Sequence, residues 1–340
     1  MNARRSGGAL RRLAKYLGAF VIVCAVGFAL WQAQRVLRFY LGPSETTLSQ
    51  TGFDWRAAEA GTMENTFRFE PSYPFWSDGA AKYRYVQFPA GTKIDNSNPD
   101  RWNFPKGTRI WKVFKRDGVY VETRMLYKTG LEPWDWDMAV YAPRADQTDS
   151  DKLALSRKNV GATEHDIPAP SDCVTCHGDR ETRRPLGLTA FQSPRTGEAG
   201  LSIARMKELG LLMAPTDHAP EIPGNESIRS VLGYLDTNCG SCHHEGSTYV
   251  TNKVPLRLNL TTATAGRVET TNAYTTAVNR KPYLDGLGTD HYVIPGKPDQ
   301  SFIYRRMKLR DNGIWQMPPI ATERVDDVGV ELVRQWILGL

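Results

Sequence analysis

Two short stretches of the chain share one pattern of cysteine and histidine: "SDCVTCHGD" at residues 171–179 and "TNCGSCHHE" at residues 237–245. Each has two cysteines three positions apart and a histidine directly after the second cysteine. The chain contains only five cysteines and six histidines in 340 residues, so the repeated pattern uses four of the five cysteines. Two copies of one pattern of reactive residues indicate a shared chemistry at both places.

Three chemistries use cysteines at this spacing. A zinc site uses two Cys-x-x-Cys pairs to complete a tetrahedral shell, a thioredoxin-like site uses one pair for disulfide exchange, and a c-type haem is attached through Cys-x-x-Cys-His. On a helical turn, positions i, i+3 and i+4 share a face, so both sulfurs reach one porphyrin edge while the imidazole reaches the iron. The histidine after each pair favours two covalent haems, with zinc and structural disulfides as the alternatives.

The two motifs assign roles to six residues. The haems would be attached through Cys173, Cys176, Cys239 and Cys242, with His177 and His243 as the proximal iron ligands.

The N-terminal segment has the composition of an export signal. Residues 1–15 carry five positive charges and no acid, and the 19 residues that follow, up to Gln34, are uncharged. Nineteen residues are just enough to cross a bilayer core, and the basic flank predicts a cytoplasmic N-terminus. No clean small-residue cleavage site follows, so we expect residues 1–40 to be an uncleaved membrane anchor rather than a cleaved signal peptide. Covalent haem attachment takes place outside the bacterial cytoplasm, so the expected location is the periplasmic side of the inner membrane.

The net charge of +6 comes from this segment alone. Residues 1–38 contain seven Lys and Arg and no acid, whereas the rest of the chain has 36 bases against 37 acids. A near-neutral remainder gives no sign of nucleic-acid binding.

Residues 45–190 read as a β-rich domain that ends in the first motif. The stretch "TRIWKVFKRDGVYVETRMLY", residues 108–127, predicts a hairpin whose two strands meet at an Asp-Gly turn. Six of the nine tryptophans lie between residues 55 and 136, which is typical of core packing in such a domain. Alternation along the second strand would place five side chains on one face: Val119, Val121, Thr123, Met125 and Tyr127.

The remainder of the chain reads as helical. Residues 191–225 contain a short amphipathic helix and a proline-rich linker, and residues 226–340 have the two framing helices of a small cytochrome c domain. The expected fold class is therefore α+β: an N-terminal membrane anchor, a β-rich domain carrying the first haem at its end, and a C-terminal helical cytochrome c-like domain.

The second haem needs an iron ligand on its other face. Met317 in "WQMPPI" supplies a thioether, which suits haem iron, and the two prolines after it stiffen the loop that presents it. Met307 is the competitor and His291 a weaker candidate, while His244 is expected at the surface. We predict Met317 as the distal ligand.

The first haem is less well specified. Only 61 residues separate His177 from Cys239, so its pocket must take walls from the β-rich domain. A vacant or water-bound iron is as compatible with the sequence as any one side chain. The candidates for the distal ligand are His165, Met125, Met206, Met213 and His218.

Longer strings in the chain resemble a family of bacterial di-haem c-type cytochromes with an N-terminal β-rich domain, whose second haem domain is similar to class I cytochrome c. The resemblance runs from about residue 66 to the end. It implies two covalent haems on the motif residues named above. The strings are "FWSDGAAKYRYVQFPAG", "WNFPKGTRIWKVFKRDG", "VETRMLY", "DCVTCH", "LGLTAFQ", "YLDTNCGSCH", "VIPGKPDQSFIYRRM" and "MPP".

Two classes of function are compatible with these features. The first is an electron carrier between a periplasmic dehydrogenase and a respiratory-chain component; some relatives are joined to a quinoprotein sugar-dehydrogenase propeller, which is absent here. The second is a haem enzyme or gas-binding protein that uses an open first haem and is fed electrons by the second. The order of β-domain and first motif is also similar to the cytochrome c-prime-beta type, in which an open haem binds nitric oxide.

Overall fold

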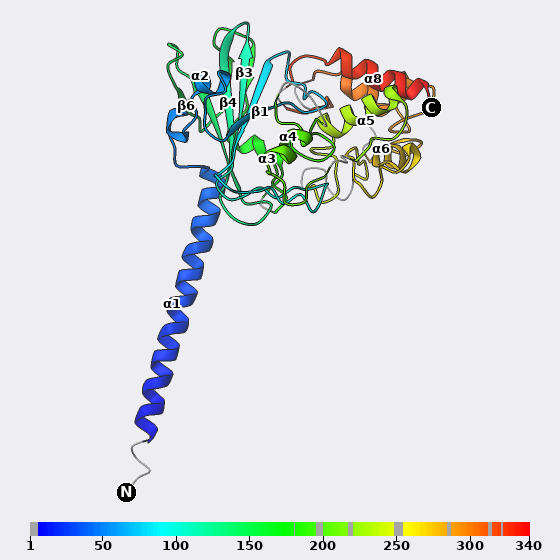
Figure 1. The fold of residues 1–340 in the computed structure, drawn as a ribbon. Helices are drawn as coiled ribbons and strands as arrows, with labels where there is room; N and C mark the ends of the chain where they lie inside the picture. Colours follow the sequence, from blue (N-terminus) through cyan, green and yellow to red (C-terminus); the bar gives the residue numbers. More distant parts are fainter. Residues whose placement is uncertain are drawn as a thin grey trace. The chain divides into compact units, whose positions relative to one another are not determined.

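The computed structural model describes residues 6–179, 181–194, 200–216, 220–247, 254–283, 287–311, 315–320 and 322–340. It divides into two compact units, Met1–Ser44 and Glu45–Leu340. Helix α1 (Ser6–Leu41) makes up the first unit. The second unit combines a mainly antiparallel sheet with the remaining helices, so the fold is mixed α and β (Figure 1).

The expected membrane anchor is corrected by this structure. A bilayer-spanning helix needs about 20 mainly apolar residues. Among the described residues, no helix is both long enough and apolar enough to cross a membrane.

A six-stranded antiparallel sheet forms the first half of the second unit. Each strand pairs with the next along the chain, and a separate two-stranded sheet follows. All eight strands lie within residues 45–190, the range expected to be rich in strands. Their bounds are β1 (Thr66–Phe69), β2 (Ala81–Gln87), β3 (Arg109–Arg116), β4 (Val119–Lys128), β5 (Trp136–Pro143) and β6 (Ser150–Lys152), then β7 (Arg157–Val160) and β8 (His165–Ile167).

The predicted hairpin between β3 and β4 is present, with one deviation. Asp117 and Gly118 both have positive φ, 50° and 82°, as a tight two-residue turn requires. The strand register shifts between Phe114 and Lys115. This bulge adds a residue to β4, so Val121 packs with Phe114, away from the face that holds Met125. The expectation that Val121 shares a face with Met125 is therefore wrong.

The two faces of the sheet have different neighbours. One face, with Trp111 and Met125, packs on the segment around Phe53. The other face, with Ile110 and Leu126, packs on α4 (Ile203–Glu208) and on the residues around Cys173. The first cysteine motif therefore lies against one defined face of the sheet.

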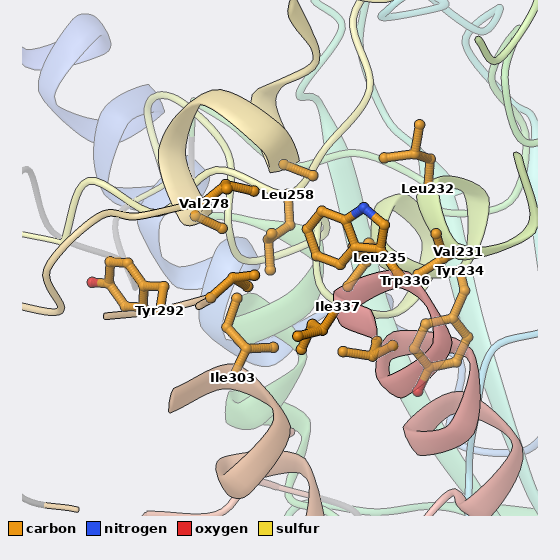
Figure 2. Packing of buried hydrophobic residues seen from close by; sticks show 14 of the residues in the cluster. Val231, Leu232, Tyr234, Leu235, Leu258, Val278, Tyr292, Ile303, Trp336 and Ile337 are labelled. Atoms are coloured by element: carbon orange, nitrogen blue, oxygen red, sulfur yellow. The ribbon is translucent and has the colours of Figure 1, made fainter. Parts of the chain in front are cut away.

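The second half of the unit is helical around a separate core. The helix expected before the second motif is α5 (Glu226–Asn238), whose N-cap Asn225 accepts a hydrogen bond from the Ile228 amide at 3.0 Å. It packs against the C-terminal helix α8 (Asp327–Leu338). Figure 2 shows Trp336 of α8 beside Leu235 of α5 in this core. The helices of the unit are α2 (Trp55–Glu59), α3 (Cys173–His177), α4, α5 (Glu226–Asn238), α6 (Asn272–Ala277), α7 (Phe302–Lys308) and α8 (Asp327–Leu338).

Both framing helices of the expected cytochrome c-like domain are thus confirmed as helices. The finer boundaries at residues 190 and 225 stay a prediction, since residues 45–340 form one compact unit.

Candidate functional site

The first motif is a single helical turn at the edge of the sheet core. Helix α3 begins at Cys173 and ends at His177. Cys173 contacts two apolar clusters of the β-rich half, one around Leu126 and one around Val140. Residues upstream of the motif therefore form walls beside it, as the short interval between the motifs predicted.

His177 is held in the tautomer that a metal ligand needs. Its Nδ1 lies 2.9 Å from the Arg184 carbonyl oxygen, and the Arg184 amide donates to the His177 carbonyl at 2.8 Å. A carbonyl can only accept, so the proton belongs on Nδ1 and Nε2 keeps its lone pair. Burial is the main reason that the pKa of His177 falls to about 4, so the ring is neutral at neutral pH.

The second motif continues directly from α5. The Cys239 amide donates to the Leu235 carbonyl at 2.9 Å, and the His243 amide donates to the Cys239 carbonyl at 2.8 Å. A Cβ on Gly240 would lie 2.6 Å from the Asp236 carbonyl oxygen, so only glycine fits at position 240. The helical turn thereby brings Cys239 and His243 into one short segment.

His243 is buried like its counterpart in the first motif. Burial lowers the pKa of its ring to about 4, against a weaker opposite effect of the Leu256 carbonyl. Its Nδ1 has no partner with full hydrogen-bond geometry. His243 is therefore neutral and can offer a ring nitrogen to a metal.

A cavity of about 100 Å³ opens beside the second motif. Most of its walls are aromatic or aliphatic. The residues around it are Trp76, Tyr234, Asn238, Cys239, Cys242, His243, Val254, Leu256, Leu258, Tyr283, Tyr292, Phe302, Ile303, Arg306, Met307, Arg310, Met317, Pro318, Asp326 and Val330.

Both candidate methionines line this cavity. Met307 is 6% exposed and belongs to the apolar core that α7 shares with α8. Met317 is half-buried, on a loop whose backbone is fixed by a hydrogen bond from its amide to the Arg306 carbonyl at 3.0 Å. Gln316 braces the same loop by donating to the Thr322 carbonyl at 3.1 Å. The structure thus brings Met317 and His243 to one cavity, while its role as ligand stays a prediction.

The two cysteine motifs touch each other. The Cys242 thiol donates to the Thr175 carbonyl at 2.9 Å, and the Arg184 guanidinium donates to the Gly240 carbonyl at 3.3 Å. The neighbouring Cys242 thiol lowers the pKa of Cys176, and the same interaction raises the pKa of Cys242. All four motif cysteines are free thiols.

The candidates for the distal ligand of the first haem are spread over different environments. Met125 lies on the sheet face away from Cys173, Met206 is buried in the core that Cys173 contacts, and Met213 is 62% exposed. His165 is buried, and its Nε2 lies 3.0 Å from Glu122. His218 lies outside the described residues.

Several residues that line the cavity had no motif to mark them. Trp76 is attached to the second motif's helix from far upstream, with its amide donating to Asn238 Oδ1 at 2.8 Å and its indole to the Arg324 carbonyl at 3.2 Å. The only sequence signal was its place in the string "FWSDG".

His244 is 8% exposed, which corrects its expected surface position. His291 forms a backbone bridge with Ser301 and is not among the described residues that line the cavity.

The donor set fits haem better than a shared zinc ion. Within the described parts of the chain, no three His, Cys, Asp or Glu side chains are grouped so that they could hold a metal ion. A zinc site needs three or four such donors, whereas a porphyrin provides most donors itself and takes only axial ligands from the protein. One neutral imidazole per motif could serve as an axial ligand, and the apolar cavity beside the second motif suits a porphyrin.

Comparison with known proteins found no match for this chain among family models, curated sequences or solved structures.

Proposed function

We propose that this chain is an exported c-type cytochrome that holds two covalent haems and transfers electrons between a dehydrogenase and a respiratory-chain partner on the periplasmic side of the bacterial inner membrane. Haem supplies one-electron redox chemistry when bound. Cys173 and Cys176 would attach the first haem, and Cys239 and Cys242 the second.

The observation that best supports a relay is the contact between the two motifs. Cys242 lies 2.9 Å from the backbone of Thr175, which sits between the two cysteines of the first motif. Both attachment points are therefore within one cluster, and two haems tethered there would have edges close together. A short separation between redox centres is what a relay needs.

The residues around the second motif would tune one high-potential centre. His243 and Met317 would hold the iron of the second haem, and a thioether ligand raises the potential of the iron. Apolar residues such as Leu256 and Phe302 line the cavity and would keep water away from it. Arg306 and Arg310 line the same cavity and would offset the negative charge of propionates.

A haem enzyme or gas-binding protein is the second candidate. It is favoured by the surroundings of the first motif, where Met125 faces away, Met213 is exposed and His165 is engaged by Glu122, which leaves Met206 as the candidate ligand in the core that Cys173 contacts. An iron without a protein ligand on its distal side would bind small gases. The carbon monoxide difference spectrum of the reduced protein separates the two candidates, because a six-coordinate carrier gives no fast response.

The haem count is the direct test of the main proposal. Protein made in a strain with the haem-attachment machinery should gain the mass of two haems and keep its colour after acid-acetone extraction. Cys239→Ala should weaken attachment at the second site and leave the first largely intact. A purified chain with zinc, with a Cys176–Cys242 disulfide or with one haem would contradict the proposal.

A further inference from the structure

Three basic residues stand directly opposite one another across the sheet. Arg84 of β2 pairs with Lys112 of β3, and Lys112 pairs with Arg124 of β4. We call these three residues the cationic row. Like charges that face each other across strands are destabilising, so an arrangement of three in register needs a compensating partner.

The cationic row lies on the face of the sheet against which the first motif packs. Each of its residues is two positions from an apolar residue of that face, namely Val86, Ile110 and Leu126. Side chains two apart in a strand point to the same side. Cys173 contacts the cluster that these apolar residues form. Burial is the main cause of the low pKa of His177, and the charges of Lys112 and Arg124 lower it further.

The protein supplies too little negative charge for the row. Glu122 binds Arg124, with Oε2 3.0 Å from Nη2, and is shared with His165. Arg84 is only 5% exposed, and its Nη2 is buried with no hydrogen-bond partner among the described residues. Among the described residues, neither Arg84 nor Lys112 forms an ion pair with an acidic side chain, and only the more distant charges of Glu70 and Glu122 raise the pKa of Arg84 and of Lys112, respectively.

Aromatic rings compensate only part of this charge. Phe75 lies 5.4 Å from the Arg84 guanidinium and 5.5 Å from the Lys112 ammonium, and Phe114 lies 4.9 Å from Lys112. A cation–π contact stabilises a cation by less than the cost of removing that cation from water. A bound anion would supply the negative charge that compensates the rest.

We propose that the cationic row is an anion site beside the first haem, that it takes a carboxylate or small oxyanion, and that a propionate of this haem is its resident anion. The proposal rests on the proposed function. Guanidinium groups bind carboxylates with two parallel hydrogen bonds, and Arg84 has a free donor for this purpose. Lys112 adds a point charge, and Arg124, already paired, flanks the site.

A redox titration of the haem-loaded protein tests the proposal. Lys112→Met removes one charge and keeps the length of the side chain, so the midpoint potential of one haem should fall while the other stays unchanged. Arg84→Met should do the same, and Lys112→Arg should retain the wild-type potential. Lys115→Met is the matched control, because Lys115 is in the same strand but its ammonium lies over Tyr120 at 4.3 Å, on the other face of the sheet. Neither potential should move in this control.

Titration with nitrite identifies the source of the anion. If propionate is resident, nitrite leaves the wild-type potentials and visible spectrum unchanged. A saturable nitrite response that is lost in Lys112→Met would show an anion site open to free oxyanions and would overturn propionate as its occupant. Unchanged potentials in both Lys112→Met and Arg84→Met, with no nitrite response, would overturn the anion site itself. The haem mass of the same samples is read separately, and a count below two contradicts the proposed function rather than this site.

Discussion

The Cys242 sulfur lies 2.9 Å from the carbonyl oxygen of Thr175, although the two residues are 67 positions apart. This contact joins the turn that follows α5 to the turn formed by α3. The β-rich half and the helical half therefore meet at their cysteine motifs. Under the proposed function, the junction of the two halves is also the path of the electron.

Replacing Met317 tests the assignment of the second iron. Thioether ligation to low-spin ferric haem gives a weak charge-transfer band at the red end of the visible spectrum. Met317→Ala should remove this band and lower the potential of one haem, because water or an empty site stabilises ferric iron better than a thioether does. The absorption spectrum and a redox titration measure both effects.

Met307 provides the control for that experiment. Met307→Ala should keep the band and destabilise the protein by roughly 2 to 5 kcal/mol, because the side chain is 6% exposed in the helical core. Loss of the band in Met307→Ala but not in Met317→Ala would exchange the roles of the two residues.

Removing the charge of Glu122 should destabilise the sheet core. Burial raises the pKa of this carboxyl, but Arg124 and His165 outweigh burial and lower it, so Glu122 is ionised. Glu122→Gln leaves the Arg124 charge without its partner, and such a loss costs about 3 to 5 kcal/mol when the pair is buried. Urea denaturation of the haem-loaded protein gives the difference in unfolding free energy.

An exposed pair sets the scale for this result. Glu208 lies 2.9 Å from Arg205 on the surface of α4, with 63% of its side chain exposed. Glu208→Gln should change stability by less than about 0.5 kcal/mol, because water and salt screen this pair. Equal losses in both variants would mean that Glu122 does not compensate a buried charge.

Asp236 should make stability depend on pH between about 4 and 6. Burial raises its pKa to about 6, against the lowering effects of the Leu260 amide, Gln192 and Arg184. The folded protein thus keeps the Asp236 proton up to about pH 6, whereas the unfolded chain, with a pKa near 3.9, releases it at a lower pH. Stability is then greatest below pH 4, falls as the pH rises to about 6 and is constant above, a loss of roughly 3 kcal/mol.

The Asp236→Asn variant isolates this contribution. Asparagine carries no charge at any pH, so thermal melting of the variant should lack the decline that wild type shows between pH 4 and 6. Comparing the two proteins removes titrations that they share. A decline of the same size in the variant would assign the effect to another group.

A glycine fixes how closely α5 and α8 approach. A Cβ on Gly329 would lie 2.0 Å from the Tyr234 hydroxyl oxygen. This hydroxyl cannot move away without weakening the hydrogen bond that it donates to Asp326 at 3.0 Å. Gly329→Ala should therefore destabilise the helical half by about 1 to 3 kcal/mol, as overpacking does. Gly339→Ala, near the end of the chain, is the control, since its Cβ would have its nearest neighbour at 3.5 Å. Thermal melting should show a loss for Gly329→Ala and almost none for Gly339→Ala.

Local patterns in the sequence were enough to predict the local structure. The Asp117-Gly118 turn, the Asn225 cap of α5 and the amphipathic C-terminal helix each depend on neighbours within a few positions, and all three are present. The spacing of the cysteine motifs likewise fixes which thiols and imidazole share a turn. The bulge near Phe114 places Val121 on the opposite face of the sheet from the one expected. The alternation of side chains in the sequence does not reveal a single added residue.

Relations between distant segments were decided only by the tertiary structure. Packing alone brings Trp76 to the cavity of the second motif, Cys242 to Thr175, and Arg84, Lys112 and Arg124 into one row. No short-range signal predicts such meetings, since they depend on strand register and on which core each half buries. The sequence thus determined the chemistry available to this protein, namely two Cys-x-x-Cys-His turns and a candidate methionine. The tertiary structure decided where these groups meet, because burial of apolar surface is non-directional and only the complete packing fixes which residues become neighbours.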